Sequence, residues 1–316
     1  RLISAQNQVI MQNEFDTKQS RIQNFLNNYK LDALLLQSSG NFAWATCGSA
    51  SFIDRATTMG IATLLITKTD RYVITNNIEK LRLAQEEKLA SQNWDFQIAP
   101  WYEQNNLLAK LTAGLRVGTD GNLPDTVNMS DEIARLRSQL TPEEGKRYKT
   151  LGALCAEAMQ QTTDAVRPGM TEYEIAGLLS QAAESRGVQA TVILIATDER
   201  IFSYRHPLPT SKKLQKYAMV ILCGRMGGLI CSTTRLVYFG TLPDELRRKG
   251  QAVAQIDAEM IAATRAGSTF GDVFHKAQEV YASTGFADEW QLHHQGGSAG
   301  YAPREFTANP TSTELI

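Results

Sequence analysis

Residues 141–171 read TPEEGKRYKTLGALCAEAMQQTTDAVRPGMT, and this stretch decides how the second half of the chain folds. It opens on Thr141-Pro142-Glu143-Glu144, a capping box with Pro at the first helical position. Apolar residues then recur at helical spacing until Arg167-Pro168-Gly169-Met170, where Pro and Gly end the pattern. We therefore expect a long helix from Thr141 to about Val166 and a domain boundary between residues 140 and 141.

The sequence after this helix predicts an α+β domain. A second capping box, Thr171-Glu172-Tyr173-Glu174, begins a helix expected to reach about Arg186. Two more helices are predicted at residues 243–264 and 271–283, and strands at residues 192–196, 218–223 and 228–239. Gly227-Gly228 connects the last two strands. Residues 141–316 should thus form a curved sheet backed by long helices.

The first half alternates helical and strand-like segments. Helices are expected at residues 16–29 and 78–89, and strands at residues 32–36, 58–67, 72–75 and 116–118. Ile22, Phe25 and Leu26 mark the apolar stripe of the first helix. Such alternation indicates an α/β layered domain in residues 1–140.

The composition argues against several classes of function. The chain has 316 residues, 43% hydrophobic and 21% charged, with a net charge of −1. A nearly neutral chain with scattered basic residues gives no reason to expect binding to nucleic acid or to an anionic membrane. No apolar run is long enough for a membrane span. The four cysteines form no CxxC pair, so we expect free thiols in a cytoplasmic protein.

Five segments, in order, resemble the creatinase/prolidase/aminopeptidase P family, M24. They are residues 141–171, the YRHPLPT of residues 204–210, residues 213–239, residues 242–267 and the HHQGG of residues 293–297. Residues 16–140 resemble the family's N-terminal domain. The resemblance implies an α/β creatinase-type domain at 1–140, an α+β pita-bread domain at 141–316, and a homodimer.

Peptidases of this family hold two divalent metal ions through two Asp, one His and two Glu. The resemblance places the two Asp positions at Leu222 and Ser232, and the His at His294 or, one residue earlier, at His293. Leu cannot bind a metal, and a neutral Ser is a poor ligand for a hard divalent cation. We therefore expect no dinuclear metal centre and no other cofactor.

The two Glu ligands follow later in the family than this sequence extends. Glu305 and Glu314 are the acids that could substitute for them. Otherwise we expect the C-terminal part of the pita-bread domain to lie beyond the given sequence.

The resemblance also suggests a metal-free site. Creatinase uses a His at the place of His206 as acid and base, and an imidazole moves protons readily near neutral pH. A loop His before Pro207 can equally be a structural hydrogen-bonding residue, and both interpretations stay open. We expect Tyr204 and Arg205 to line the same substrate pocket. The alternative is that they are ordinary surface residues.

Four other basic residues belong to the expected site or its surroundings. Arg55 matches a position that reaches a neighbouring active site in creatinase-like proteins, where it would bind a substrate carboxylate; a surface ion pair with Asp54 is the alternative. His293 and His294 would point to opposite faces of a strand, so we expect His294 to face the pocket. His275 should lie on a helix surface.

Three functions follow from these residues. The first is a hydrolase of a small amide, dipeptide-like or guanidino compound, working without the metal pair and using His206. The second is a non-catalytic protein that keeps the fold and binds a small ligand. The third is a metal-dependent Xaa-Pro peptidase whose ligands lie in another register.

Overall fold

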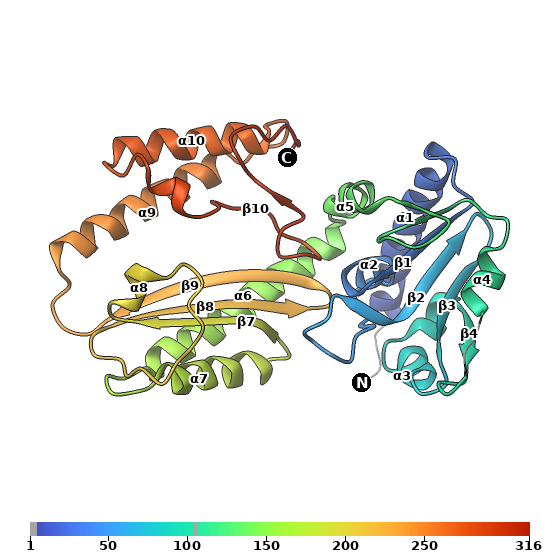
Figure 1. Ribbon diagram of the computed structural model, residues 1–316, viewed down its shortest axis with the longest axis horizontal. Helices are drawn as coiled ribbons and strands as arrows, with labels where there is room; N and C mark the ends of the chain where they lie inside the picture. Colours follow the sequence, from blue (N-terminus) through green and yellow to red (C-terminus); the bar gives the residue numbers. More distant parts are fainter. Residues whose placement is uncertain (1–4, 104–105) are drawn as a thin grey trace. The chain divides into compact units, whose positions relative to one another are not determined.

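The structure is a computed structural model that describes residues 5–103 and 106–316, with side chains in the first helix described from Asn13 onward (Figure 1). The chain divides into two units. Unit 1 takes residues 1–153 with Gly224–Cys231 and Gly300–Ala302, and unit 2 takes Leu154–Cys223, Ser232–Ala299 and Pro303–Ile316. The domain boundary expected between residues 140 and 141 stays a prediction. Across the described residues, no helix has both the length and the apolar character that a membrane crossing requires.

Unit 1 is built on a six-stranded mixed sheet in the order β4-β3-β2-β1-β5-β6. The strands are β1 Ala33–Ser38, β2 Met59–Thr67, β3 Arg71–Asn76, β4 Asp95–Ala99, β5 Val117–Thr119 and β6 Thr126–Asn128. The central strand β1 is antiparallel to β2 and parallel to β5, with Leu35 opposite Leu65 and Thr119. Every residue from Ala33 to Leu36 is buried, as expected for a strand covered on both faces.

Helices cover this sheet. They are α1 Ala5–Asn28, α2 Ser39–Ala45, α3 Lys80–Gln85, α4 Leu107–Thr112 and α5 Ser130–Ser138, with a 3-10 turn at Leu89–Gln92. Leu108 and Leu111 of α4 pack against a core of Ala33, Leu35, Leu65 and Val117. The predicted α/β alternation is confirmed here, although the short elements α2, α4, α5, β4 and β6 are additions to the prediction.

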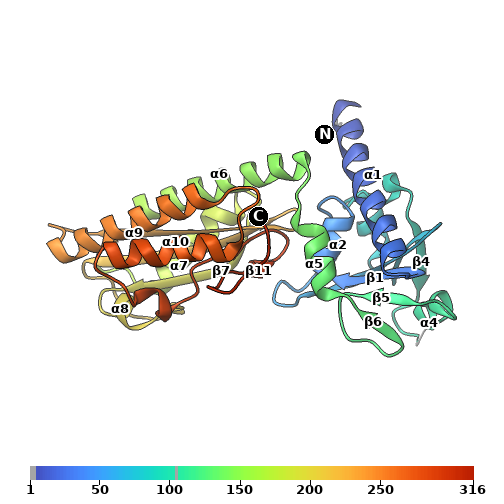
Figure 2. The same cartoon turned by 90° about the horizontal axis from the view of Figure 1, so that it is seen from above.

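Unit 2 combines long helices with the three-stranded sheet β7-β8-β9. Its elements are α6 Pro142–Ala165, α7 Glu172–Glu184, β7 Gln189–Thr197, α8 Arg200–Ser203, β8 Tyr217–Met226, β9 Leu229–Tyr238, α9 Asp244–Ala263, α10 Phe270–Ser283, a 3-10 turn at Glu289–Leu292, β10 Gly297–Ser298 and β11 Phe306–Thr307. Parts of α6, β8 and β9 belong to unit 1. The four predicted long helices and three predicted strands are confirmed. In Figure 2, α9 and α10 lie side by side.

The faces of β8 differ in chemistry. Ala218, Val220 and Leu222 are fully buried, whereas the alternate residues Tyr217 and Met219 are only partly buried. Alternate residues of a strand point to opposite faces. One face of β8 therefore belongs to the core, and the other carries the side chains that line the candidate site described below.

A buried lysine organises unit 1. The side chain of Lys18 on α1 is fully buried, and its Nζ lies 2.7 Å from a carboxylate oxygen of Glu14 and 2.7 Å from one of Glu144. It also donates to the carbonyl oxygen of Trp44 at 2.8 Å. Arg147 donates to both oxygens of Glu14, at 2.6 and 2.8 Å. Two acids and two bases thus neutralise one another inside unit 1.

Glu144 is the acid that the first capping box predicts. One of its oxygens accepts from the backbone N–H of Thr141 at 2.6 Å, and its own N–H donates to the Thr141 hydroxyl. The other oxygen accepts from the hydroxyl of Tyr301 at 2.6 Å. The residue that begins α6 therefore also balances the charge of Lys18 and holds Tyr301 in place.

Glu172, the first residue of α7, anchors the loop that carries His206. Its carboxylate is buried and accepts from the backbone N–H groups of Thr197 at 2.8 Å and Thr210 at 2.9 Å. It also pairs with Arg200, whose guanidinium donates to the carbonyl of Leu208 at 3.0 Å. Burial opposes ionisation, but the hydrogen bonds from Arg200, Thr210 and Thr197 outweigh it and lower the pKa of Glu172. Both ends of the loop are thus tied to one carboxylate.

The first prediction concerns Glu14. Burial acts to raise its pKa, but the hydrogen bond from Arg147 and the charge of Lys18 bring it down from 4.5 to about 2. A lowered pKa stabilises the fold above pH 4.5, and this stabilisation is lost as the pH falls towards 2. We expect Glu14→Gln to reduce the free energy of unfolding at pH 7 by about 3 kcal/mol.

Urea unfolding measured between pH 7 and pH 2 tests this. The difference between Glu14→Gln and the parent should shrink below pH 4.5, because a protonated Glu carries no charge, like Gln. Glu279→Gln, at an exposed position, is the control and should change stability by less than about 0.5 kcal/mol. A difference for Glu14→Gln that is independent of pH would contradict the ionic role.

The second prediction concerns Glu172. Glu172→Gln removes the charge opposite Arg200 while keeping the shape, so we expect amide hydrogen exchange at residues 204–210 to rise roughly 10- to 100-fold. Glu174→Gln is the matched control, because Gln also completes a capping box. Equal protection of this loop in both variants would show that Glu172 does not hold it.

Candidate functional site

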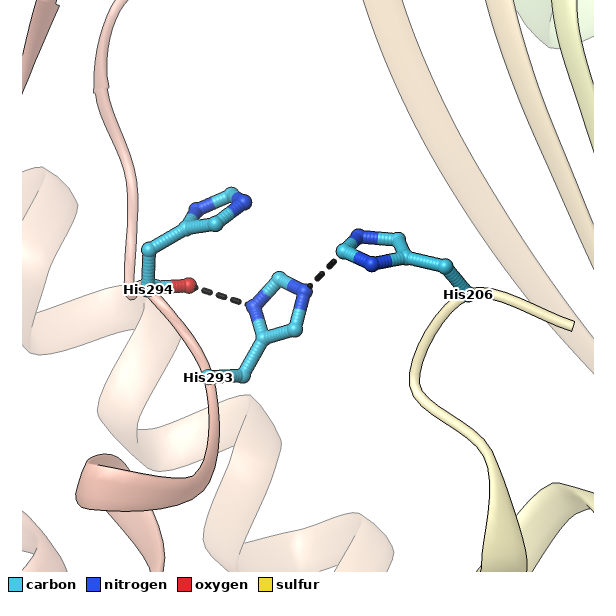
Figure 3. Close-up of side chains that lie close together, drawn as sticks. All are labelled: His206, His293 and His294. Atoms are coloured by element: carbon cyan, nitrogen blue, oxygen red, sulfur yellow. Dashed lines mark hydrogen bonds between the residues drawn. The ribbon is translucent and has the colours of Figure 1, made fainter.

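Three of the four histidines of the chain come together in unit 2 (Figure 3). His206 lies in the loop after α8, and His293 and His294 follow the 3-10 turn Glu289–Leu292. The Nε2 atoms of His206 and His293 are 3.0 Å apart, and the ring centroids 4.8 Å. His294 stacks beside them, with its ring centroid 4.1 Å from that of His293 and 6.3 Å from that of His206.

The hydrogen bonds assign the tautomer of His293. Its Nδ1 lies 2.6 Å from the carbonyl oxygen of His294, which can only accept, so Nδ1 carries a proton. A neutral His293 then presents an unprotonated Nε2 to His206, whose Nε2–H donates. If His293 gains a proton, the direction of the bond reverses. The pair can therefore pass one proton between the two Nε2 atoms.

His294 has a different environment. Partial burial and the nearby charges of His293, Arg304 and His206 lower its pKa below the usual value for histidine. A lowered pKa favours the neutral imidazole at pH 7, because an imidazolium would be disfavoured by burial and by its basic neighbours. His294 thus offers an uncharged ring nitrogen beside the His206–His293 pair.

The strand expected at His293 and His294 is wrong, since both lie outside any strand. An irregular chain after the 3-10 turn lets both imidazoles face the same cavity, which a strand would prevent. His293 was not expected to face the pocket, yet it is the residue that contacts His206. His275 lies exposed on α10, as expected.

His293 and His294 line a cavity of about 610 Å³. Its walls are mainly apolar, from Ile201, Phe202, Tyr217, Met219, Leu236, Ala252, Val253, Ile256, Tyr281, Phe286 and Leu292. Its polar lining consists of Arg205, Lys249, Glu289, His293, His294 and Gln295. A largely apolar cavity with a few convergent polar groups is typical of a small-molecule site.

Of the other three expected site residues, Arg205 lines the cavity, whereas Tyr204 and Arg55 do not. Arg205 lines the cavity, where its guanidinium lies 3.9 Å from the carboxylate of Glu289. Tyr204 is exposed and outside the lining, with the guanidinium of Arg200 5.3 Å from its ring centroid. Arg55 is exposed and belongs to unit 1. Asp54, its alternative partner, accepts from the N–H of Ala56 at 2.9 Å.

The residues present do not fit the dinuclear metal set implied by the resemblance. Leu222 is fully buried on the core face of β8. The residue that faces Ser232 is Cys223, because the Ser232 hydroxyl donates to its sulfur at 3.1 Å. The first ligand position is thus better matched with Cys223 than with Leu222, and neither register supplies a carboxylate.

Among the described residues, one group of three or more His, Cys, Asp or Glu side chains lies close enough together to hold a metal ion. It consists of His206, His293 and His294. Glu305 and Glu314, the acids considered as substitutes, are not part of it.

The contacts that His293 and Glu172 make at the site were not predicted from the sequence. The pairing of His293 with His206 depends on the irregular path of the chain after Leu292, for which the sequence carries no clear periodic signal. Glu172 was seen as part of a capping box. Its second role could have been suspected because an acid at the first turn of a helix is also free to accept from neighbouring loops.

The chain matches known proteins in sequence. The model of metallopeptidase family M24 matches residues 146–312. A Xaa-Pro dipeptidase of Lactobacillus helveticus is 27% identical over 199 residues, covering 62% of this chain and 54% of the relative. An uncharacterized peptidase of Schizosaccharomyces pombe is 22% identical over 338 residues, covering 96% of this chain and 73% of the relative. The chain thus spans only about half the length of the Lactobacillus relative.

Solved structures share the fold. The prolidase from Pyrococcus horikoshii OT3 superposes with a TM-score of 0.80 at 16% identity, covering 95% of this chain and 87% of its own. A Xaa-Pro dipeptidase from Bacillus anthracis gives 0.78 at 16% identity, with 96% and 87% covered. The N-terminal domain of FACT complex subunit SPT16 from Cicer arietinum gives 0.70 at 10% identity, with 96% and 85% covered.

The expected fold class, an α/β creatinase-type domain followed by a pita-bread domain, is confirmed by these structures. The family model covers more than half of the 316 residues, and its match includes all three histidines of the candidate site. This chain belongs to metallopeptidase family M24.

Proposed function

We propose that this chain is an M24-type hydrolase that cleaves a C–N bond of a small amide, dipeptide-like or guanidino compound without the family's carboxylate-held metal pair. The observation that carries the proposal is the His206–His293 pair, whose Nε2 atoms lie 3.0 Å apart and whose His293 lines a cavity. The proposal is made for the natural protein, whether or not it extends beyond these 316 residues.

The pair supports proton transfer in both directions. Hydrolysis of a C–N bond needs a base that removes a proton from the attacking water and an acid that protonates the leaving nitrogen. His206, whose Nε2–H donates to His293, takes the first proton on its free Nδ1 and gives it to the leaving nitrogen as the C–N bond breaks. His293, held through Nδ1 by a backbone carbonyl, accepts or returns a proton across the 3.0 Å bond.

The cavity supports a small substrate with an apolar part and an anionic part. Arg205 and Lys249 are the cationic groups of its lining. A guanidinium binds a carboxylate through two parallel hydrogen bonds, so we assign Arg205 to the substrate carboxylate. His294, whose neutral ring is favoured, contacts the substrate or the tetrahedral intermediate. Tyr204 remains a candidate substrate contact.

Arg55 would act between subunits. It lies in the N-terminal part of the chain, and we propose that in a homodimer it reaches the site of the partner copy as a second carboxylate anchor. Its exposure is consistent with such a contact.

The second candidate function is a ligand-binding protein without catalysis. Neither register of β8 and β9 provides the paired carboxylates, and the same fold occurs in a domain of a FACT complex subunit. The third, a metal-dependent Xaa-Pro peptidase, follows the name of the Lactobacillus relative. Added manganese or cobalt would have to produce activity on proline dipeptides for that reading to hold.

The third prediction is that His206→Ala removes the turnover of any substrate found by screening amides, dipeptides and guanidino compounds. Loss of a general acid–base residue lowers kcat by about 10²- to 10⁴-fold. Circular dichroism and thermal unfolding should be unchanged, because His206 is exposed. His275→Ala, an exposed histidine on α10, is the control and should keep the parental rate.

Parental turnover in His206→Ala would refute the assignment of His206. Metal chelators should leave the parental rate unchanged or raise it. A loss of activity on chelation that manganese restores would favour the metal-dependent peptidase instead. The absence of turnover on every compound, with ligand binding retained, would favour the binding protein.

A further inference from the structure

We propose that His206, His293 and His294 together bind one divalent transition-metal ion, through three imidazole nitrogens. The resemblance places the family's single His ligand at His294 or His293, but this site uses no carboxylate ligand and holds one ion instead of a pair. It does not depend on the proposed hydrolysis. Figure 3 shows the three rings turned towards one another from two segments of unit 2.

The distances are close to those of a three-histidine site. Each residue offers a ligand atom, and these atoms lie within 4.8 Å of one another. Zinc binds imidazole nitrogen at about 2.0–2.1 Å in a tetrahedral arrangement, which separates two ligand nitrogens by about 3.3 Å. The two Nε2 atoms of His206 and His293 are already 3.0 Å apart. His206 and His294 are exposed, so their rings can turn to close the remaining gap without disturbing the core.

A second observation points to a ligand independently of these distances. Histidines that bind metals usually donate their other ring N–H to a carbonyl or carboxylate, which fixes the tautomer and directs the free nitrogen at the metal. His293 has this bond, from Nδ1 to the carbonyl oxygen of His294 at 2.6 Å. Its Nε2 lone pair is therefore already turned towards the centre of the cluster.

The donor set selects the class of ion. Neutral imidazole suits zinc, copper, nickel and cobalt, whereas magnesium and calcium require oxygen ligands. The carboxylate of Glu289 lines the adjoining cavity and supplies negative charge nearby, although Arg205 lies 3.9 Å from it.

Metal binding and proton transfer would exclude each other here. An ion that takes the Nε2 lone pairs of His206 and His293 removes the atoms through which the pair would pass a proton. If the chain is the proposed hydrolase, zinc at this site inhibits it.

The fourth prediction tests binding directly. Cobalt(II), titrated into the full chain at pH 7.5 and followed by visible absorption, should bind one equivalent with the spectrum of a tetrahedral nitrogen site, and zinc should displace it. His206→Ala, His293→Ala and His294→Ala should each weaken binding at least about 100-fold, since even loss of a supporting bond weakens metal sites 10- to 100-fold. His275→Ala should bind like the parent.

Three results would overturn the site. They are no cobalt or zinc binding by the parent, binding in the three histidine variants as tight as in the parent, or a thiolate-to-cobalt absorption band that places the ion on a cysteine. Because binding is read without turnover, the two proposals fail separately. Cobalt binding in a chain that turns nothing over upholds the site and counts against the hydrolase, and turnover without binding does the reverse.

Discussion

The ion cluster around Lys18 is the constraint on which unit 1 depends. An ammonium group with no access to solvent is tolerated only when paired and hydrogen-bonded, and Lys18 is held by Glu14, Glu144 and the carbonyl of Trp44. Its partners come from segments far apart in sequence, and Tyr301 is added through Glu144. Satisfying one charge thereby fixes α1, α2, the start of α6 and the segment Gly300–Ala302 together. Such a cluster specifies an arrangement more than it adds stability, because alternative packings would leave a charge unpaired.

Unit 2 uses the same device for its functional loop. Glu172 holds both ends of the loop between β7 and β8, so the position of His206 is set by a carboxylate rather than by apolar packing. In both units the decisive acid stands in the first turn of a helix, where free backbone N–H groups favour negative charge. The helix starts thus serve as fixed points from which irregular segments are positioned, and the histidine cluster forms where two such segments meet.

The long elements and the family resemblance could be predicted, because capping boxes, apolar periodicity and ordered motifs are local signals. Glu144 and Glu172 were recognised only as parts of capping boxes, since their second partners come from distant segments. His293 was placed on the wrong face because a strand was assumed where the chain is irregular. The register at Leu222 and Cys223 likewise needed the contact with Ser232. A sequence defines the spacing of residues along the chain, whereas a site depends on contacts between side chains that are far apart in the sequence.

The balance of charges around Lys18 also limits how this part of the chain can evolve. Glu14, Lys18, Glu144 and Arg147 form a neutral set, so replacing any one of them leaves an uncompensated charge in the interior. A path of single substitutions towards an apolar core must pass through such an intermediate, which is strongly destabilised. We therefore expect related chains to keep all four residues or to exchange them as a group.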